Sequence, residues 1–92
     1  MNKKLSIEEI QKIVDKWVTQ FPRGYFSPLS QLAQLTEEVG ELARVINRKY
    51  GSQIGKTEEN LPKELADELA DVLFVIVCIA NNSGVDLAKA FE

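Results

Sequence analysis

Hydrophobic residues recur every three or four positions in several stretches of the chain, which is the spacing of helices with one apolar stripe. The first stretch covers residues 7–20. Ser6 precedes it as a candidate cap, and the helix dipole favours Glu8 and Glu9 in its first turn. Phe21-Pro22 ends it, because the residue before a proline disfavours helical backbone. The apolar positions of this predicted helix are Ile7, Ile10, Ile13, Val14, Trp17 and Val18.

A second helix is predicted from Pro28, which suits the first helical position after the cap Ser27, to about Tyr50. Gly51 can supply the left-handed residue that closes this helix. Residues 51–60 are polar and contain glycine, so we expect a mobile connection there. The apolar positions of the second helix are Leu29, Leu32, Leu35, Val39, Leu42 and Ile46.

The third predicted helix begins at Asn60 or Leu61 and continues to about Ser83. Its residues 72–80 are rich in valine and isoleucine and also fit a buried strand. They directly follow residues 64–71, a strong helix-forming stretch, and this continuity favours a helix.

The predicted fold class is all-α: a bundle of three long helices plus a short C-terminal helix, in a single domain over residues 1–92. The short helix runs from Leu87 to Phe91, and Asp86 can cap it. Helices two and three form a hairpin, and helix one packs against it. No stretch shows the two-residue period of a half-buried strand.

The third predicted helix is apolar on every side from Val72 to Ala80, so it must be covered on every side. Helices one and two each offer a single apolar stripe. A face near Leu73 and Val77, or on the other side near Phe74, is therefore left without a partner inside one chain. Such apolar patches mark protein interfaces. We expect a homodimer whose two hairpins form a four-helix core, or a tetramer built from two such dimers.

Composition excludes several classes of function. The chain has a formal net charge of −3 and so lacks the broad basic field that attracts nucleic acid. It has no histidine, which excludes Ser-His-Asp and Cys-His catalysis and His-ligated zinc. Its one cysteine, Cys78, cannot form a disulfide within the chain and fits a reducing compartment. The N-terminus is polar, and the longest apolar run has nine residues, so we expect a cytoplasmic protein without a membrane partner.

Carboxylates cluster on the two long helices of the predicted hairpin, and each cluster falls within an arc of about 100°. Acids four residues apart repel each other, and each such pair costs about 0.2–0.5 kcal/mol. Only Arg44 and Lys63 lie three or four residues from one of these acids, where a base offsets the repulsion. The alternative is a solvated acidic face, but lysines would then be expected between the acids. The clusters are Glu37, Glu38 and Glu41 in the second helix and Glu64, Asp67, Glu68 and Asp71 in the third.

The acids of the third helix continue its inward-facing apolar stripe, which consists of Val72, Val75, Cys78 and Ile79. Acids at the end of a buried stripe must be neutralised, and neither histidine nor a dense set of bases is there to do it. Carboxylate oxygens without nitrogen or sulfur ligands suit Mg²⁺, with Mn²⁺ as the alternative. Such an ion neutralises phosphate oxygens and acidifies a bound water. Glu37 is positioned as the catalytic base that takes the proton of that water.

Three segments of the chain together form a specific pattern. They read L-T-E-E-V-G-E-L-A at 35–43, E-L-A-D-V-L-F at 68–74 and I-A-N-N-S-G-V-D-L-A-K-A at 79–90. This pattern resembles the MazG-like nucleotide pyrophosphohydrolases, an all-α family that uses magnesium to hydrolyse nucleoside triphosphates to monophosphate and pyrophosphate. The resemblance implies a house-cleaning role in the nucleotide pool. It also implies that the metal ligands are Glu38, Glu41, Glu68 and Asp71.

One ambiguity lies inside the second motif, because Glu64 and Asp67 also match the spacing E-x-x-D. Only the later pair, Glu68 and Asp71, is followed by V-L-F, as the resemblance requires.

The resemblance also indicates residues that meet the substrate, and Asn81 matches a frequent asparagine of the family. Family members commonly continue with a helix whose basic and amide side chains reach the phosphates, whereas this chain ends at Glu92. Either the chain is truncated, or other bases bind the phosphates. The candidates are Lys16, Arg23, Arg44, Arg48 and Lys49 for the phosphates and Trp17, Tyr25 and Phe26 for stacking on the base, although core or interface packing is the favoured interpretation of Trp17.

Two functions follow from these observations. The first is magnesium-dependent hydrolysis of nucleoside triphosphates by a homo-oligomer. The second is a non-catalytic oligomeric helical module that keeps the acids without turnover. A di-iron bundle would need Glu-x-x-His pairs and is excluded by the absence of histidine.

Overall fold

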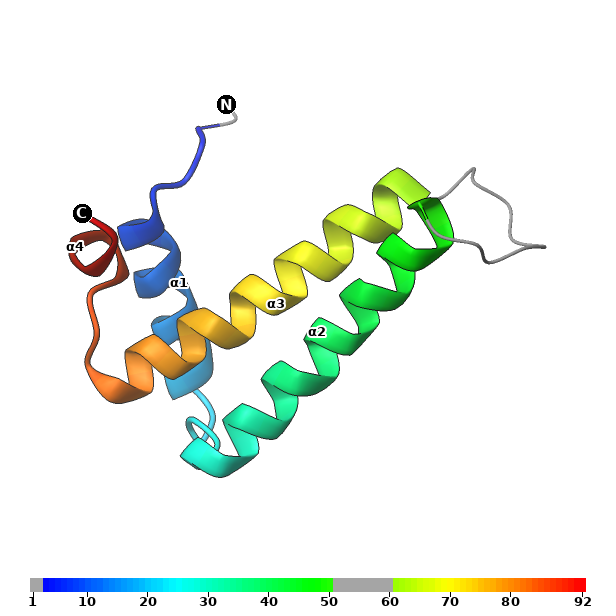
Figure 1. Ribbon diagram of the computed structural model, residues 1–92. Helices are drawn as coiled ribbons and strands as arrows, with labels where there is room; N and C mark the ends of the chain where they lie inside the picture. Colours follow the sequence, from blue (N-terminus) through cyan, green and yellow to red (C-terminus); the bar gives the residue numbers. More distant parts are fainter. Residues whose placement is uncertain (1–2, 51–60) are drawn as a thin grey trace.

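The computed structural model of the chain describes residues 3–50 and 61–92, and this part contains helices and no strand. Two long helices lie side by side as a hairpin, the first helix packs on the C-terminal part of the third, and the last lies beside the first (Figure 1). The all-α prediction is confirmed. The predicted closing residue Gly51 and the connection 51–60 lie outside the described residues. The helices are α1 (Ile7–Thr19), α2 (Pro28–Tyr50), α3 (Leu61–Ser83) and α4 (Leu87–Phe91).

Local side-chain hydrogen bonds fix the starts of α1 and α4, as the sequence predicts. The Ser6 hydroxyl accepts from the Glu9 backbone N–H at 3.1 Å, and the Glu9 carboxylate accepts from the Ser6 N–H at 2.9 Å. This reciprocal pair satisfies two N–H groups at the start of α1. The Asp86 carboxylate accepts from the Lys89 N–H at 3.0 Å and caps α4. Between α3 and α4, Gly84 has a φ of 71°, which a residue without Cβ adopts without strain.

The core lies where α1 crosses α3. Val14 and Val18 of α1 pack with Val77 and Cys78 of α3, and Val77 is fully buried. The expectation that Val77 lies on an uncovered face is therefore wrong. The reason is that α1 crosses α3 at this position and covers it. Within the described part of the chain, no helix has both the length and the hydrophobicity to cross a membrane.

The apolar positions of α2 form two stripes, whereas one was predicted. Leu35 and Leu42 are partly buried, and Val45 is buried. The second stripe, which we call the outer stripe, recurs every seven residues on another side of the helix and is exposed. It consists of Leu32, Val39 and Ile46, whose exposed fractions are 58%, 47% and 41%.

Helix α3 also keeps apolar side chains at the surface. Leu69, Leu73 and Ile76 have exposed fractions of 51%, 37% and 37%. The inward stripe of α3 is confirmed, because Val75 and Cys78 are buried. The hairpin thus carries apolar surface on both of its helices, and the predicted oligomeric core remains a prediction.

Candidate metal centre and nucleotide pocket

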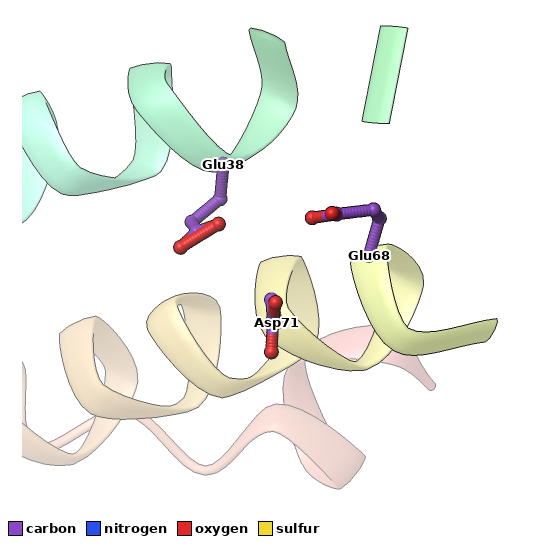
Figure 2. Close-up of side chains that lie close together, drawn as sticks. All are labelled: Glu38, Glu68 and Asp71. Atoms are coloured by element: carbon purple, nitrogen blue, oxygen red, sulfur yellow. The ribbon is translucent and has the colours of Figure 1, made fainter. Parts of the chain in front are cut away.

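Three carboxylates meet between α2 and α3. Glu38 extends from α2 toward Glu68 and Asp71, which stand three residues apart on one face of α3 (Figure 2). One carboxylate oxygen of each residue lies within 4.8 Å of those of the other two. Glu38 and Glu68 are partly buried, and Asp71 is exposed. We refer to these three residues as the carboxylate group.

Negative charge dominates the carboxylate group. Partial burial, followed by the charges of Asp71, Glu41 and Glu38, raises the pKa of Glu68, and Arg44 opposes this rise. Among residues 3–50 and 61–92, no lysine or arginine forms a salt bridge with any member of the group. Converging carboxylates with only oxygen donors fit a hard divalent cation such as Mg²⁺ or Mn²⁺. The residues present therefore suit the metal that the sequence predicts.

The structure places the other two acids of α2 differently. Glu41 is partly buried but outside the carboxylate group, and the Arg44 guanidinium donates to its carboxylate at 2.7 Å. Glu37 is exposed and also lies outside the group. Of the four predicted ligands, the folded chain thus brings three together and holds the fourth one turn away on α2.

Two further acids of α3 have basic partners. Glu64 forms an ion pair with Arg48 across the hairpin, and the Arg48 side chain is only 18% exposed. Asp67 pairs with Lys63 at 3.2 Å on the surface. Glu68 and Asp71 thus lie close to Glu38, whereas the alternative E-x-x-D pair, Glu64 and Asp67, forms ion pairs with basic residues instead.

An apolar hollow of about 190 Å³ lies next to the carboxylate group. Phe74 lines it three residues after Asp71 on α3, and Gln34 lines it four residues before Glu38 on α2, so the two features are one helical turn apart. Trp17 also lines the hollow and meets Phe21 and Phe74 edge to face, with its ring centroid 5.2 and 6.0 Å from theirs. The remaining lining residues are Val18, Phe21, Arg23, Gly24, Tyr25, Phe26, Gln31 and Cys78.

Comparison with known proteins decides the family. The sequence profile of the MazG nucleotide pyrophosphohydrolase domain matches residues 26–92. The chain belongs to the MazG family. The predicted resemblance is thereby confirmed, and its span agrees with the segments that carry the motifs.

Two relatives resemble this MazG domain over nearly its whole length. The Bacillus subtilis protein YpjD is 46% identical over 87 residues, which are 95% of this chain and 78% of YpjD. Its crystal structure superposes with a TM-score of 0.89 at 47% identity, covering 99% of this chain and 91% of that one. The crystal structure of the Bacillus-conserved MazG protein, described as a nucleotide pyrophosphohydrolase, gives a TM-score of 0.84 at 42% identity. That match covers 98% of this chain and 85% of the other.

Several lining residues of this MazG domain were missed from the sequence. Gln31 is 2% exposed, donates to the Cys78 carbonyl at 3.3 Å and accepts from the Asn82 amide at 3.3 Å. Gln34 is partly buried and lines the hollow. Their spacing was the available signal, because Gln31 precedes the inward Leu35, and Gln34 precedes Glu38, by one helical turn.

Asn81, a predicted substrate contact, is the centre of a hydrogen-bond network. Its amide nitrogen donates to the Gln11 backbone carbonyl and to the Tyr25 hydroxyl, both at 3.0 Å, and its oxygen accepts from the Gln11 side-chain amide at 2.9 Å. The Tyr25 hydroxyl donates to Asp15 at 2.7 Å. Burial and this carboxylate raise the pKa of Tyr25 to about 12. The network ties α1 and the loop before α2 to the end of α3.

Replacing Asn81 by alanine is expected to lower the free energy of unfolding by about 1–3 kcal/mol, because partly buried partners lose their hydrogen bonds. Urea unfolding measures this loss. The matched control is Asn82→Ala, because the exposed Asn82 makes only two bonds, both at 3.3 Å, and should cost less. An Asn81→Ala protein with unchanged stability and a raised KM for nucleotide would instead indicate a direct substrate contact.

Proposed function

We propose that this MazG domain hydrolyses nucleoside triphosphates to nucleoside monophosphate and pyrophosphate with Mg²⁺, or alternatively Mn²⁺, as a house-cleaning enzyme of the nucleotide pool. The observation that carries the proposal is the carboxylate group of Glu38, Glu68 and Asp71 beside an apolar hollow. A nucleotide has matching parts, because its charged phosphates need a cation and its flat base needs apolar walls.

The proposed metal ligands are Glu38, Glu41, Glu68 and Asp71. A bound divalent ion supplies charge neutralisation of the phosphates and a lower pKa for a bound water. In the proposed reaction, water attacks the α-phosphorus, the bond to the bridging oxygen breaks, and pyrophosphate leaves. Glu37 accepts the proton of the attacking water, as the sequence predicts for this exposed acid next to Glu38.

The apolar hollow is the proposed site for the base. Trp17 and Tyr25 supply aromatic faces. The Arg23 guanidinium lies over the Phe26 ring, 4.3 Å from its centroid. The Arg44 guanidinium, on α2 beyond the carboxylate group, is the proposed phosphate contact, whereas the other predicted contact, Arg48, is paired with Glu64.

A panel of nucleoside and deoxynucleoside triphosphates tests the proposed reaction. With magnesium, at least one of them is expected to yield pyrophosphate and monophosphate in equal amounts, and a chelator should stop the reaction. Release of orthophosphate instead would place the cleavage at the β–γ bond. No turnover on any substrate, together with no saturable heat when magnesium is added, would favour the non-catalytic helical module.

Trp17→Ala is expected to raise the KM for the preferred nucleotide by about 5- to 150-fold, because stacking on a base contributes roughly 1–3 kcal/mol. Steady-state kinetics measures the change. Trp17→Phe keeps an aromatic face and should recover most of the loss. Phe91→Ala, at a 94% exposed side chain on α4, is the matched control and should leave KM unchanged. A Trp17→Ala protein with normal KM would exclude this stacking role.

A further inference from the structure

Glu41 is the predicted metal ligand that lies outside the carboxylate group, and Arg44 is its partner there. The Arg44 Nη2 donates to the Glu41 Oε2 at 2.7 Å within α2. The two side chains are 66% and 46% exposed, so both have room to change rotamer. Glu41 follows Glu38 by three residues, which is the spacing at which side chains on a helix are neighbours.

Resting on the function proposed above, we propose that Arg44 holds Glu41 as an internal counter-ion until metal binds, and that the released guanidinium then binds a phosphate of the nucleotide. An exposed pair of this kind contributes little stability and is readily exchanged. A divalent ion bound by the carboxylate group would compete with the guanidinium for Glu41, because it carries two positive charges rather than one. The planar guanidinium, once free, matches phosphate oxygens in a two-point contact.

The two arginines of α2 differ in a way that assigns this role to Arg44. Arg48 pairs with Glu64 across the hairpin, and its side chain is only 18% exposed, so the pair is held by packing. Arg44 is mostly exposed, and its partner stands next to the carboxylate group. Arg44 is thus bonded to the one predicted ligand that stands a helical turn from Glu38, where it competes with a cation for Glu41.

The test measures two affinities of the Arg44→Gln protein. Titration of magnesium alone, followed by calorimetry, is expected to show a Kd about two- to fivefold lower than in the unmodified chain, because the competing cation is gone. With saturating magnesium, the affinity for the α,β-imido analogue of dATP, which resists cleavage, is expected to fall about tenfold or more. The proposal therefore predicts that magnesium binds more tightly and the nucleotide analogue more weakly, whereas a purely structural role of Arg44 would weaken the binding of both.

Two further variants make the result decisive. Lys63→Gln removes a similar exposed ion pair from α3 and is expected to change neither affinity. In a Glu41→Gln background, Arg44→Gln should no longer tighten magnesium binding, because Arg44 acts on the metal through Glu41. The proposal is overturned if Arg44→Gln leaves the magnesium Kd unchanged, if Lys63→Gln lowers it equally, or if the effect persists without Glu41. An unmodified chain that binds no magnesium would instead refute the proposed function itself.

Discussion

Glu68→Gln is expected to lower kcat/KM by about a thousandfold, while the helical circular dichroism stays unchanged. Glu68 is one of the three acids of the carboxylate group, and the charges of Asp71, Glu41 and Glu38 all act on it. Removing its charge removes one oxygen ligand and part of the attraction for the metal. The same loss is expected for Glu38→Gln, Glu41→Gln and Asp71→Asn. Steady-state kinetics with excess magnesium, together with calorimetry of magnesium binding, measures each variant.

The metal-free stability of the Glu68→Gln protein should move in the opposite direction. Relief of repulsion between like charges is expected to raise the free energy of unfolding by a few tenths of a kcal/mol. Asp67→Asn is the matched control, because Asp67 is on the same helix, outside the carboxylate group, and paired with Lys63. It should keep its activity. Near-normal rates for all four ligand variants would show that the metal assignment is wrong.

Glu37→Gln separates the proposed base from the proposed ligands. This variant should bind magnesium normally and lose rate, because the exposed Glu37 lies outside the carboxylate group. A loss of magnesium binding would move Glu37 into the ligand set, and an unchanged kcat would exclude it as the base.

The fold could be predicted from local rules, and the reason is visible at the helix ends. Ser6 and Asp86 cap α1 and α4 through bonds to residues three positions later, so a short stretch of sequence contains the whole interaction. The meeting of acids from α2 and α3 followed from a similar rule, whereas the choice of Glu38, Glu68 and Asp71 among them came from the resemblance to the MazG family. Each acid lies at a helical spacing from its neighbours, and a hairpin of two helices brings the two clusters together.

Features that depend on how the helices cross could not be predicted in this way. Val77 was expected on an open face, but α1 crosses α3 at this point and buries it completely. The pairing of Glu41 with Arg44 is one of several local arrangements of nearly equal energy, so spacing alone does not choose it. The apolar hollow needs residues from α1, the following loop, α2 and α3, and no single periodic pattern contains them.

Leu73→Glu is expected to convert an oligomer of this chain into a monomer. Leu73 is 37% exposed on α3, between Leu69 and Ile76, which are also partly exposed. The outer stripe of α2 adds a second exposed apolar surface on the same hairpin. Two hairpins that pack through these surfaces would form a four-helix core, and a symmetric dimer is the commonest closed assembly. A carboxylate in that core would have no partner, and its burial is costly.

Light scattering at micromolar concentration measures the mass of each variant. The unmodified chain should exceed the 10.3 kDa of a single copy by a factor of two or four, and Leu73→Glu should approach the single mass. Val77→Glu is the contrasting variant: because Val77 is fully buried under α1, it should unfold the protein rather than only dissociate it. Phe91→Glu adds the same charge at a 94% exposed position of α4 and should leave the assembly intact. A monodisperse single copy of the unmodified chain would exclude the four-helix core, because the apolar stripes would then face water without a partner.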